Sequence, residues 1–564
     1  MRTSGPPLIR FPKKLQTVVP VLFFALLLLA GVVLHDDYGG FTDELLHIQT
    51  AAINYKYILL KFIPPENIPP IPIYDLEEIP DMRGYVNQYY GEAAMMPTLF
   101  VNLIPGLSLS DADFLNFRRF YTFGNFFIAL ICFYLLLRIR FSDQWIPAIG
   151  TFFLLLTPRF FAESFYNSKD IIFFCWFLIS IFGIGLFLLQ NRSSGLLIFA
   201  FAFGLAVNTR IYGIVLLPAF LCVSLVDNAI HHGNAKKRRT MILLSGALAL
   251  FFFYIVTPYL WENPVAGFLN ALRFSATAVG ISPTDLISET NRVTLGNHEL
   301  FMGKFIIPGE TWYYIPVWMG ITIPVFYILT YCAELFFLCK QTIQTQRTRS
   351  APVQYLFDGF CFGLFFLCLA GIILEKPTLY HGWRHVYFLF APFIYLSVCG
   401  FGNLWNISFQ KKPGKIRWKT LLAGISLVSF ATTGFWMVKN HPLDFAYFNE
   451  IGRHYASQFT RDYWGVASKK CILDLAGEYT EGQPLRLGVN ADLTYGSTQI
   501  SLLRFPDEVQ KRFTVIWKNE NADYLCFSYN NILGNDHVIP EFEIMKTYQV
   551  DGYDVAAIYR RINE

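Results

Sequence analysis

Two adjacent carboxylates, Asp43 and Glu44, follow the first apolar run of the chain within about ten positions. A carboxylate at such a place can act as a general base that deprotonates an attacking hydroxyl. It can also belong to a helix start, because Thr42 is a good N-cap residue and acidic residues in a first turn favour the helix dipole. A solvated linker is the third possibility, and the pair alone leaves all three open.

A second set of ionisable residues lies in short connectors between later apolar runs. These connectors are PRFFAESFYNSKD (158–170), NTR (208–210) and LYHGWRHVYF (379–388). An ionisable group at membrane depth costs about 2.5–3.5 kcal/mol even on insertion-based scales, so each is a candidate for function. Snorkelling of a single Arg or Lys to the interface is the plainer alternative. The candidates are Glu163, Lys169, Asp170, Arg210, His381, Arg384 and His385.

Arg210, Arg384 and His385 on one face, opposite a set of carboxylates, predict a site for an anion with a base nearby. A lipid phosphate fits, because an arginine fork matches phosphate oxygens in a bidentate manner. One such pair at ~4 Å contributes up to about 4 kcal/mol near a protein surface. Asp43 could then deprotonate an acceptor hydroxyl that attacks the carbon carrying the phosphate.

The chain that has to position these residues is mostly apolar. Of its 564 residues, 54% are hydrophobic and 15% charged, whereas soluble proteins are about 25% charged. We therefore expect a polytopic α-helical membrane domain over 1–437 and a small α/β domain over 438–564. We expect about eleven transmembrane helices, one for each of the apolar runs 18–35, 120–137, 144–158, 171–189, 196–208, 211–226, 241–257, 313–338, 356–374, 386–404 and 420–437.

The distribution of Lys and Arg predicts the orientation in the membrane. If 196–226 forms two spans, the basic clusters, among them 236–239 and 411–419, all fall on one side. Such clusters are cytoplasmic. The N-terminus is then cytoplasmic, and the first loop (36–119), a later loop (258–312) and the C-terminal domain are extracytoplasmic. We expect a multi-pass membrane protein in contact with the lipid bilayer, and no nucleic-acid partner.

Some local structure is also predicted. The proline-rich PPENIPPIPIY (64–74) predicts an extended connector. In the C-terminal domain, 545–559 predicts an Asp-Gly hairpin, and 513–517 and 523–528 predict further strands. An amphipathic helix lying on the membrane is predicted from apolar residues at helical spacing in the first loop, namely Leu45, Ile48, Ala52, Tyr55 and Leu59.

The ten cysteines include no CxxC pair, so they predict no zinc or redox motif. Seven of them lie in apolar runs, and Cys339 directly follows one. Cys471 and Cys526 lie in the C-terminal domain and could pair in an oxidising compartment.

The order of these segments resembles a known class. The acidic pair is followed by the connector at 158–170, by NTRIYGIVLLP (208–218), by ETWYYIPVWMGITIP (310–324) and by LYHGWRHVYFLF (379–390). The chain resembles the GT-C membrane glycosyltransferases, close to the branch of protein O-mannosyltransferases and lipid A aminoarabinose transferases. FAYFNEIGRHY (445–455) and RDYWGVASKK (461–470) are similar to the start of the tail in bacterial members of that group.

This resemblance implies an enzyme that transfers a sugar, with inversion, from a polyprenyl-phosphate donor to a hydroxyl on the extracytoplasmic face. It implies that Asp43 is the catalytic base with Glu44 as its neighbour, that Asp170 is the second-loop acid, and that Arg384 binds the donor phosphate. Arg210 stands where related motifs more often carry Lys, and it keeps the charge. We expect Lys169 and His385 to complete the phosphate site, with His381 and Glu163 as support.

Several points stay open at this stage. Asp43, Asp170 and His381 could share a divalent ion, but no strong metal cage is evident, and no cofactor is predicted. The acceptor could be a lipid, a glycan or a protein. A transporter or lipid flippase is the main alternative function, although the sequence shows no internal repeat of the kind that transporters use. A non-catalytic scaffold or receptor would not need Arg210 or Arg384.

Overall fold

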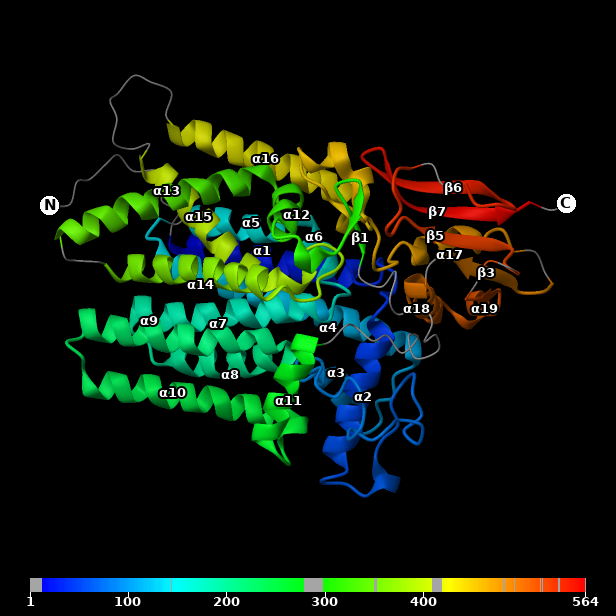
Figure 1. The fold of residues 1–564 in the computed structure, drawn as a ribbon, viewed down its shortest axis with the longest axis horizontal. Coiled ribbons are helices and arrows are strands. Elements are labelled where there is room, and N and C mark those ends of the chain that lie inside the picture. Colours follow the sequence, from blue (N-terminus) through cyan, green and yellow to red (C-terminus); the bar gives the residue numbers. More distant parts are fainter. Residues whose placement is uncertain are drawn as a thin grey trace.

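Figure 1 shows the fold in a computed structural model, which describes residues 13–562 except 144, 278–297, 349–351, 408–417, 480–481, 491, 518, 520 and 536–537. Long helices lie side by side in a bundle, and a sheet lies beyond one end of it, at the right of the figure. The predicted fold class, a polytopic helical membrane protein with a small C-terminal α/β domain, is confirmed.

Each of the eleven apolar runs forms helix. By length and apolar composition, seven described stretches can cross a membrane, or eight if α12 and α13, bent by 120°, count as one span. The apolar part of α1, α5 and α8 are shorter apolar helices. The bundle consists of α1 (Lys13–Leu34), α4 (Asp111–Arg140), α5 (Trp145–Leu155), α7 (Asp170–Gln190), α8 (Ser194–Thr209), α9 (Leu216–His231), α10 (Lys236–Ile255), α12 (Tyr314–Thr322), α13 (Val325–Thr348), α14 (Val353–Glu375), α15 (Phe390–Ile407) and α16 (Trp418–Asn440).

α7 is the central helix of the bundle, and it packs on α4, α8 and α15. Its close approach to α8 depends on glycine. A Cβ on Gly183 would lie 2.8 Å from the carbonyl oxygen of Gly195, which cannot move aside easily. Small residues at such crossings let two backbones approach and pack without a side chain between them. The position of Asp170, at the start of α7, is therefore fixed by the core of the bundle.

The first loop contains α2 (Glu44–Leu59), η1 (Pro65–Asn67), α3 (Pro97–Phe100) and η2 (Val101–Leu103). The predicted amphipathic helix is confirmed as α2, but its expected membrane face is wrong. Ile48, Ala52 and Tyr55 pack in a buried cluster with other first-loop residues and with Phe114 and Leu115 of α4. The proline-rich connector contains one short helical turn, η1, instead of being extended throughout.

The C-terminal sheet has the strand order β4-β3-β5-β7-β6, with β3 parallel to β4 and β5 and the other pairs antiparallel. The predicted hairpin is confirmed, since Asp551 and Gly552 at its tip both have positive φ, as a type I′ turn requires. Cys471 and Cys526 are both unpaired and buried. The strands are β3 (Leu485–Val489), β4 (Phe513–Val515), β5 (Tyr524–Ser528), β6 (Phe542–Val550) and β7 (Tyr553–Arg561), with helices α17 (Ser468–Leu475), α18 (Asp492–Leu503) and α19 (Asp507–Gln510).

Short elements gather where the bundle meets this domain. Figure 1 shows α2, α3, α11 and β1 at that end, and α2 contacts α18. The later loop is described only in part, because 278–297 lie outside the described residues. The division at residue 437 stays a prediction. The short elements are α6 (Pro158–Glu163), η3 (Ile211–Val215), η4 (Pro258–Leu260), α11 (Pro264–Thr277), β1 (Glu299–Phe301), β2 (Lys304–Ile306), η6 (Pro308–Glu310), η7 (Arg384–Leu389), η8 (Asp444–Ala446) and η9 (Gly452–Gln458).

Candidate active site

Asp43 lies immediately before α2, in the N-cap position, and its side chain makes no capping hydrogen bond. The prediction that Thr42 caps this helix is wrong. The Thr42 hydroxyl instead donates to the carbonyl oxygen of Trp464 at 3.3 Å. The Asp43 carboxylate is therefore free of a capping role, and 27% of its side-chain surface remains exposed.

Arg384 joins Asp43 to the second predicted acid. Its Nη1 lies 3.6 Å from Oδ2 of Asp43 and 3.3 Å from Oδ2 of Asp170. Arg210 forms a further ion pair with Asp170, whose side chain is fully buried. We call Asp43, Asp170, Arg210 and Arg384 the four-charge cluster. Its two acids and two guanidinium groups balance, which is the condition under which buried charges are tolerated.

The sequence around Asp170 explains how this carboxylate is held. Asn167 accepts a hydrogen bond from the backbone N–H of Asp170 at 2.8 Å, and its amide donates to the Asp170 carboxylate at 3.2 Å. The same amide donates to Glu163 at 2.6 Å. Tyr387 also donates to Glu163 at 2.6 Å, and burial raises the pKa of Glu163 to about 7. Glu163 thus supports the connector and does not contact Asp43.

Aromatic rings surround the Arg384 guanidinium. Its Cζ lies 4.7 Å from the ring centre of Tyr380, 4.9 Å from that of Tyr463 and 4.4 Å from that of Trp464. The last two residues belong to the C-terminal segment. Such packing over ring faces favours a guanidinium and keeps it rigid. The sequence did not single out Tyr463 or Trp464, although both stand in the RDYWG motif.

The cluster retains unused hydrogen-bonding capacity. Among the described residues, four buried nitrogens in and around it have no hydrogen-bond partner. They are Nε of Arg210, Nε of Arg384, Nδ1 of His381 and Nδ1 of His385. Burial and the nearby Arg384 charge lower the pKa of His381, so its ring is neutral. The His381 ring stacks on Tyr463, which restricts this residue to a supporting place.

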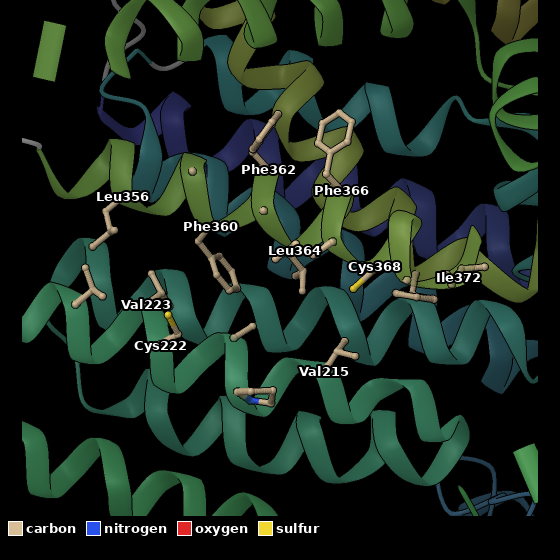
Figure 2. A pocket seen from close by; sticks show the side chains of 18 of the residues that line it. Val215, Cys222, Val223, Leu356, Phe360, Phe362, Leu364, Phe366, Cys368 and Ile372 are labelled. Atoms are coloured by element: carbon tan, nitrogen blue, oxygen red, sulfur yellow. The ribbon is translucent and has the colours of Figure 1, made fainter. Parts of the chain in front are cut away.

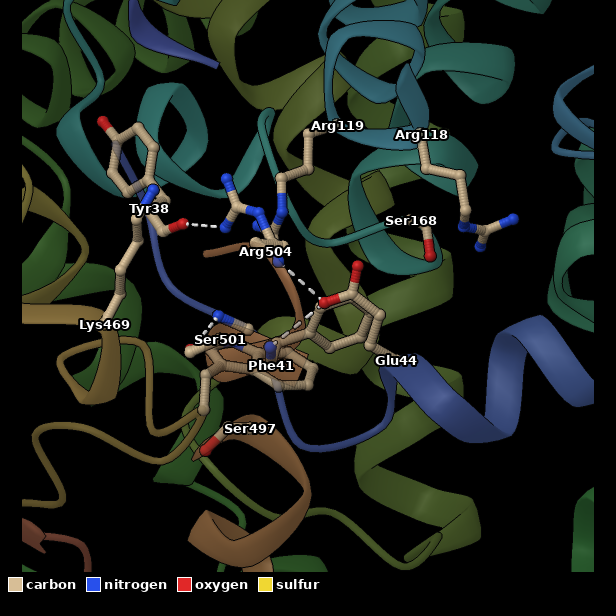
Figure 3. A network of polar contacts seen from close by, with 12 residues as sticks. Tyr38, Phe41, Glu44, Arg118, Arg119, Ser168, Lys469, Ser497, Ser501 and Arg504 are labelled. Atoms are coloured by element: carbon tan, nitrogen blue, oxygen red, sulfur yellow. Dashed lines mark hydrogen bonds and ion pairs between the residues drawn. The ribbon is translucent and has the colours of Figure 1, made fainter. Parts of the chain in front are cut away.

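Two predicted residues have partners outside the cluster. Lys169 Nζ lies 3.1 Å from Glu92, and both side chains are buried. Glu44 forms a 2.8 Å ion pair with Arg119, also buried, and accepts a hydrogen bond from the backbone of Phe41. Figure 3 shows the Glu44 carboxylate turned toward Arg119. Glu92 and Arg119 were missed, because each acquires its role only from a partner about 75 residues away.

The described residues contain one group of potential metal ligands, and it lies elsewhere. Glu334, Asp358 and Cys399 meet inside the bundle, where Arg140 already forms two hydrogen bonds with Asp358. The set Asp43, Asp170 and His381 does not form such a group. Because both arginines of the cluster occupy Asp170, a divalent ion would have to displace them. The residues therefore do not fit a metal site here.

An apolar cavity of about 1720 Å³ lies between α9, α13 and α14. Figure 2 shows Val215, Phe360 and Leu364 among the side chains that line it. Ile211 and Tyr212, the two residues after Arg210, also line the cavity. The cavity therefore reaches the chain segment that follows Arg210.

Comparison with known proteins bears on this site. Residues 122–261 match the family described as Dolichyl-phosphate-mannose-protein mannosyltransferase. The resemblance predicted from the sequence motifs is confirmed over this segment, which contains Glu163, Lys169, Asp170 and Arg210. Asp43 and Arg384 lie outside it.

Two solved structures are similar to the whole chain. Crystal structures of ArnT from Cupriavidus metallidurans, in the apo state and bound to undecaprenyl phosphate, have TM-scores of 0.43 and 0.44 and 12% sequence identity. The alignments cover 97% and 96% of this chain and 98% of each ArnT chain. No curated protein matches the chain in sequence.

Proposed function

We propose that the chain is an integral membrane glycosyltransferase that moves a sugar from a polyprenyl-phosphate donor to an acceptor hydroxyl. The observation that carries the proposal is the position of Arg384, a buried cation 3.6 Å from a partly exposed carboxylate. This places an anion-binding group beside a candidate base. A transferase of this type needs both within the length of one sugar phosphate.

The proposal gives each residue of the cluster a role. Arg384 and Arg210 bind the donor phosphate, and Asp170 holds both guanidinium groups in place. Asp43 takes the proton from the acceptor hydroxyl, whose oxygen forms the new bond to the anomeric carbon. The bond from that carbon to the phosphate oxygen breaks, and the polyprenyl phosphate leaves as an anion that the arginines stabilise. A single displacement of this kind inverts the anomeric centre.

The cavity beside Arg210 suits the polyprenyl chain of the donor. A hydrocarbon tail lying along Ile211 and Tyr212 would place its phosphate at the four-charge cluster. Apolar lining stabilises such a tail by about 25 cal/mol per Å² of buried surface. His385, whose buried Nδ1 has no hydrogen-bond partner among the described residues, would donate a hydrogen bond to the phosphate, whereas the charge of Lys169 is already balanced by Glu92. A lipid flippase would also use this cavity, but it would have no use for a carboxylate beside the bound phosphate.

The membrane orientation is part of the proposal. The four-charge cluster lies at the end of the bundle near the C-terminal domain, whereas 236–239 form the first turn of α10, at the opposite end of the bundle (Figure 1). The positive-inside rule then places the reaction on the extracytoplasmic face of a bacterial inner membrane. The acceptor, whether lipid, glycan or protein, would approach from that side.

The test is sugar transfer by purified protein carrying Asp43→Asn, which keeps the shape and removes the base. A general base contributes roughly 10²–10⁴-fold, so turnover should fall by at least about a hundredfold while donor binding persists. Asp81→Asn, an exposed first-loop acid, is the matched control and should be normal. Near-normal turnover in Asp43→Asn would refute the assignment. Donor binding without transfer by the unmodified protein would favour the flippase.

A further inference from the structure

Residues 36–42 form the segment between α1 and α2 that leads to Asp43. The C-terminal domain holds this segment in place. Arg504, just after α18, donates to the carbonyl oxygen of Tyr38 and, at 3.0 Å, to that of Asp36. It also forms a 2.6 Å ion pair with the Asp36 carboxylate. Its Nε donates to Asn116 of α4 at 2.8 Å. The Arg504 side chain is fully buried, and each of these hydrogen bonds goes to residues that precede the C-terminal domain; Figure 3 shows the one to Tyr38.

Further main-chain contacts continue along the same segment toward Asp43. The backbone N–H of Gly40 donates to the Ser501 hydroxyl at 2.7 Å. The backbone N–H of Thr42, the residue before Asp43, donates to the carbonyl oxygen of Trp464 at 3.2 Å. These contacts act on the backbone of residues 36–42, and they therefore fix where this segment lies.

Glycine allows this close approach. A Cβ on Gly39 would lie 2.1 Å from the carbonyl oxygen of Val466, and a Cβ on Gly40 would lie 2.5 Å from that of Ser497. Both contacts are with backbone of the C-terminal domain, so neither can be relieved by a rotamer change. Any side chain at these positions would push residues 36–42 away from the C-terminal domain.

The same C-terminal segment also contacts the opposite side of the site. The ring of Trp464 packs on Arg384, and the carbonyl oxygen of Trp464 accepts a hydrogen bond from the backbone N–H of Thr42. The Tyr463 hydroxyl accepts a hydrogen bond from Arg384 at 3.4 Å. One short stretch of chain thus touches both the residue before the base and the cation across from it.

We infer that the C-terminal domain completes the active site by fixing the distance between Asp43 and Arg384, with Arg504 as the main positioning residue. The inference rests on the proposed role of Asp43 as base. A domain that served only as an attached module would need no more than an apolar interface. It would not need a buried guanidinium that donates hydrogen bonds to two backbone carbonyl oxygens. Misplacement of a catalytic group by 1 Å can reduce rate by about 10²-fold.

The experiment measures donor binding and sugar transfer in the full-length protein, so that turnover is expressed per bound donor and inactive protein does not count. Arg504→Met should lower this quantity by about 10- to 100-fold. Donor affinity should stay within about threefold, because Arg384 keeps its contact with Asp170. Arg504→Lys should recover part of the loss. Arg486→Met, which removes an exposed arginine of the same domain that pairs with Asp523, is the control.

A second variant guards against a folding defect in Arg504→Met. Gly40→Ala leaves every catalytic side chain intact and adds one methyl group against Ser497. It should show the same loss per bound donor. Gly124→Ala, where a Cβ meets nothing within 4 Å, is its control and should be normal.

The outcomes separate this inference from the proposed function. Normal turnover per bound donor in both Arg504→Met and Gly40→Ala overturns the inference, even if Asp43→Asn is inactive. A parallel loss of donor binding and transfer also overturns it, because the contact would then only support folding. An active Asp43→Asn protein would remove the proposed function itself.

Discussion

The carboxylate next to the proposed base offers a sharp test, because Asp43 and Glu44 have different partners, Arg384 and Arg119. Glu44 is buried and paired with Arg119 at 2.8 Å, and side-chain exposure is 3% and 1%. Nε and Nη1 of Arg119 have no hydrogen-bond partner among the described residues. Glu44 is therefore the main group that balances the buried charge of Arg119. Replacement of Glu44 by Gln leaves a buried guanidinium without a counter-charge.

The expected effect is on stability. Breaking a buried ion pair by removing one partner costs about 3–5 kcal/mol of the free energy of unfolding. The total for a folded domain is only about 5–15 kcal/mol, so Glu44→Gln should lower the thermal midpoint in detergent markedly. Turnover of the protein that remains folded should stay within a few-fold of normal. Glu66→Gln, an exposed acid in the same loop, is the control.

A double variant isolates the pair itself. Glu44→Gln with Arg119→Gln removes both charges, so much of the lost stability should return. The measurements are thermal unfolding in detergent and turnover per bound donor for each protein. A Glu44→Gln protein of normal stability whose turnover falls more than about a hundredfold would show that Glu44 takes part in the chemistry.

Three further outcomes are expected. Arg384→Ala and Arg210→Ala should each weaken donor binding, measured with a polyprenyl phosphate, more than acceptor binding; unchanged donor affinity would reduce both to interface anchors. Burial raises the pKa of Asp462 to about 7, so the folded chain holds a proton that the unfolded chain loses above about pH 4, and stability falls as pH rises between these values. Asp462→Asn should therefore raise the thermal midpoint more at pH 8 than at pH 5. In intact cells, an impermeant thiol reagent should label Leu533→Cys and not Asn234→Cys; labelling of the latter would contradict the orientation.

Local patterns were sufficient for part of this fold. The hairpin at Asp551-Gly552 was predictable because two adjacent residues set its turn type. The apolar runs were predictable because a membrane span is a property of one segment. The meeting of Asp43 and Arg384 was predictable only through the assumption that both emerge on one face.

Other features depend on partners far apart in the chain. Thr42 is of a residue type that often caps helices. Its hydroxyl nevertheless donates to the carbonyl oxygen of Trp464, which is 422 positions away. The apolar face of α2 looks like a membrane-facing surface until Phe114 and Leu115 are seen to cover it. Arg504 was missed for the same reason, since an arginine in a soluble tail gives no sign that it will be buried against the first loop. Long-range choice of partner, not local propensity, decides these cases.

The four-charge cluster also predicts how donor binding changes the base. Burial raises the pKa of the Asp43 carboxyl, and the charge of Arg384 opposes this rise. A donor phosphate that binds Arg384 shares its positive charge, so the opposition weakens and the pKa of Asp43 rises further. A carboxylate with a higher pKa is a stronger base, so Asp43 becomes a stronger base when the sugar donor is bound.

The pH dependence of kcat/KM for the donor reports the pKa of Asp43 in the free enzyme, and that of kcat reports its pKa in the complex with the donor. The acid limb of kcat should therefore lie at higher pH than that of kcat/KM, and in Arg384→Lys, which keeps the charge, the order should persist. Coincident limbs, or a kcat limb at lower pH, would show that the phosphate does not draw on Arg384.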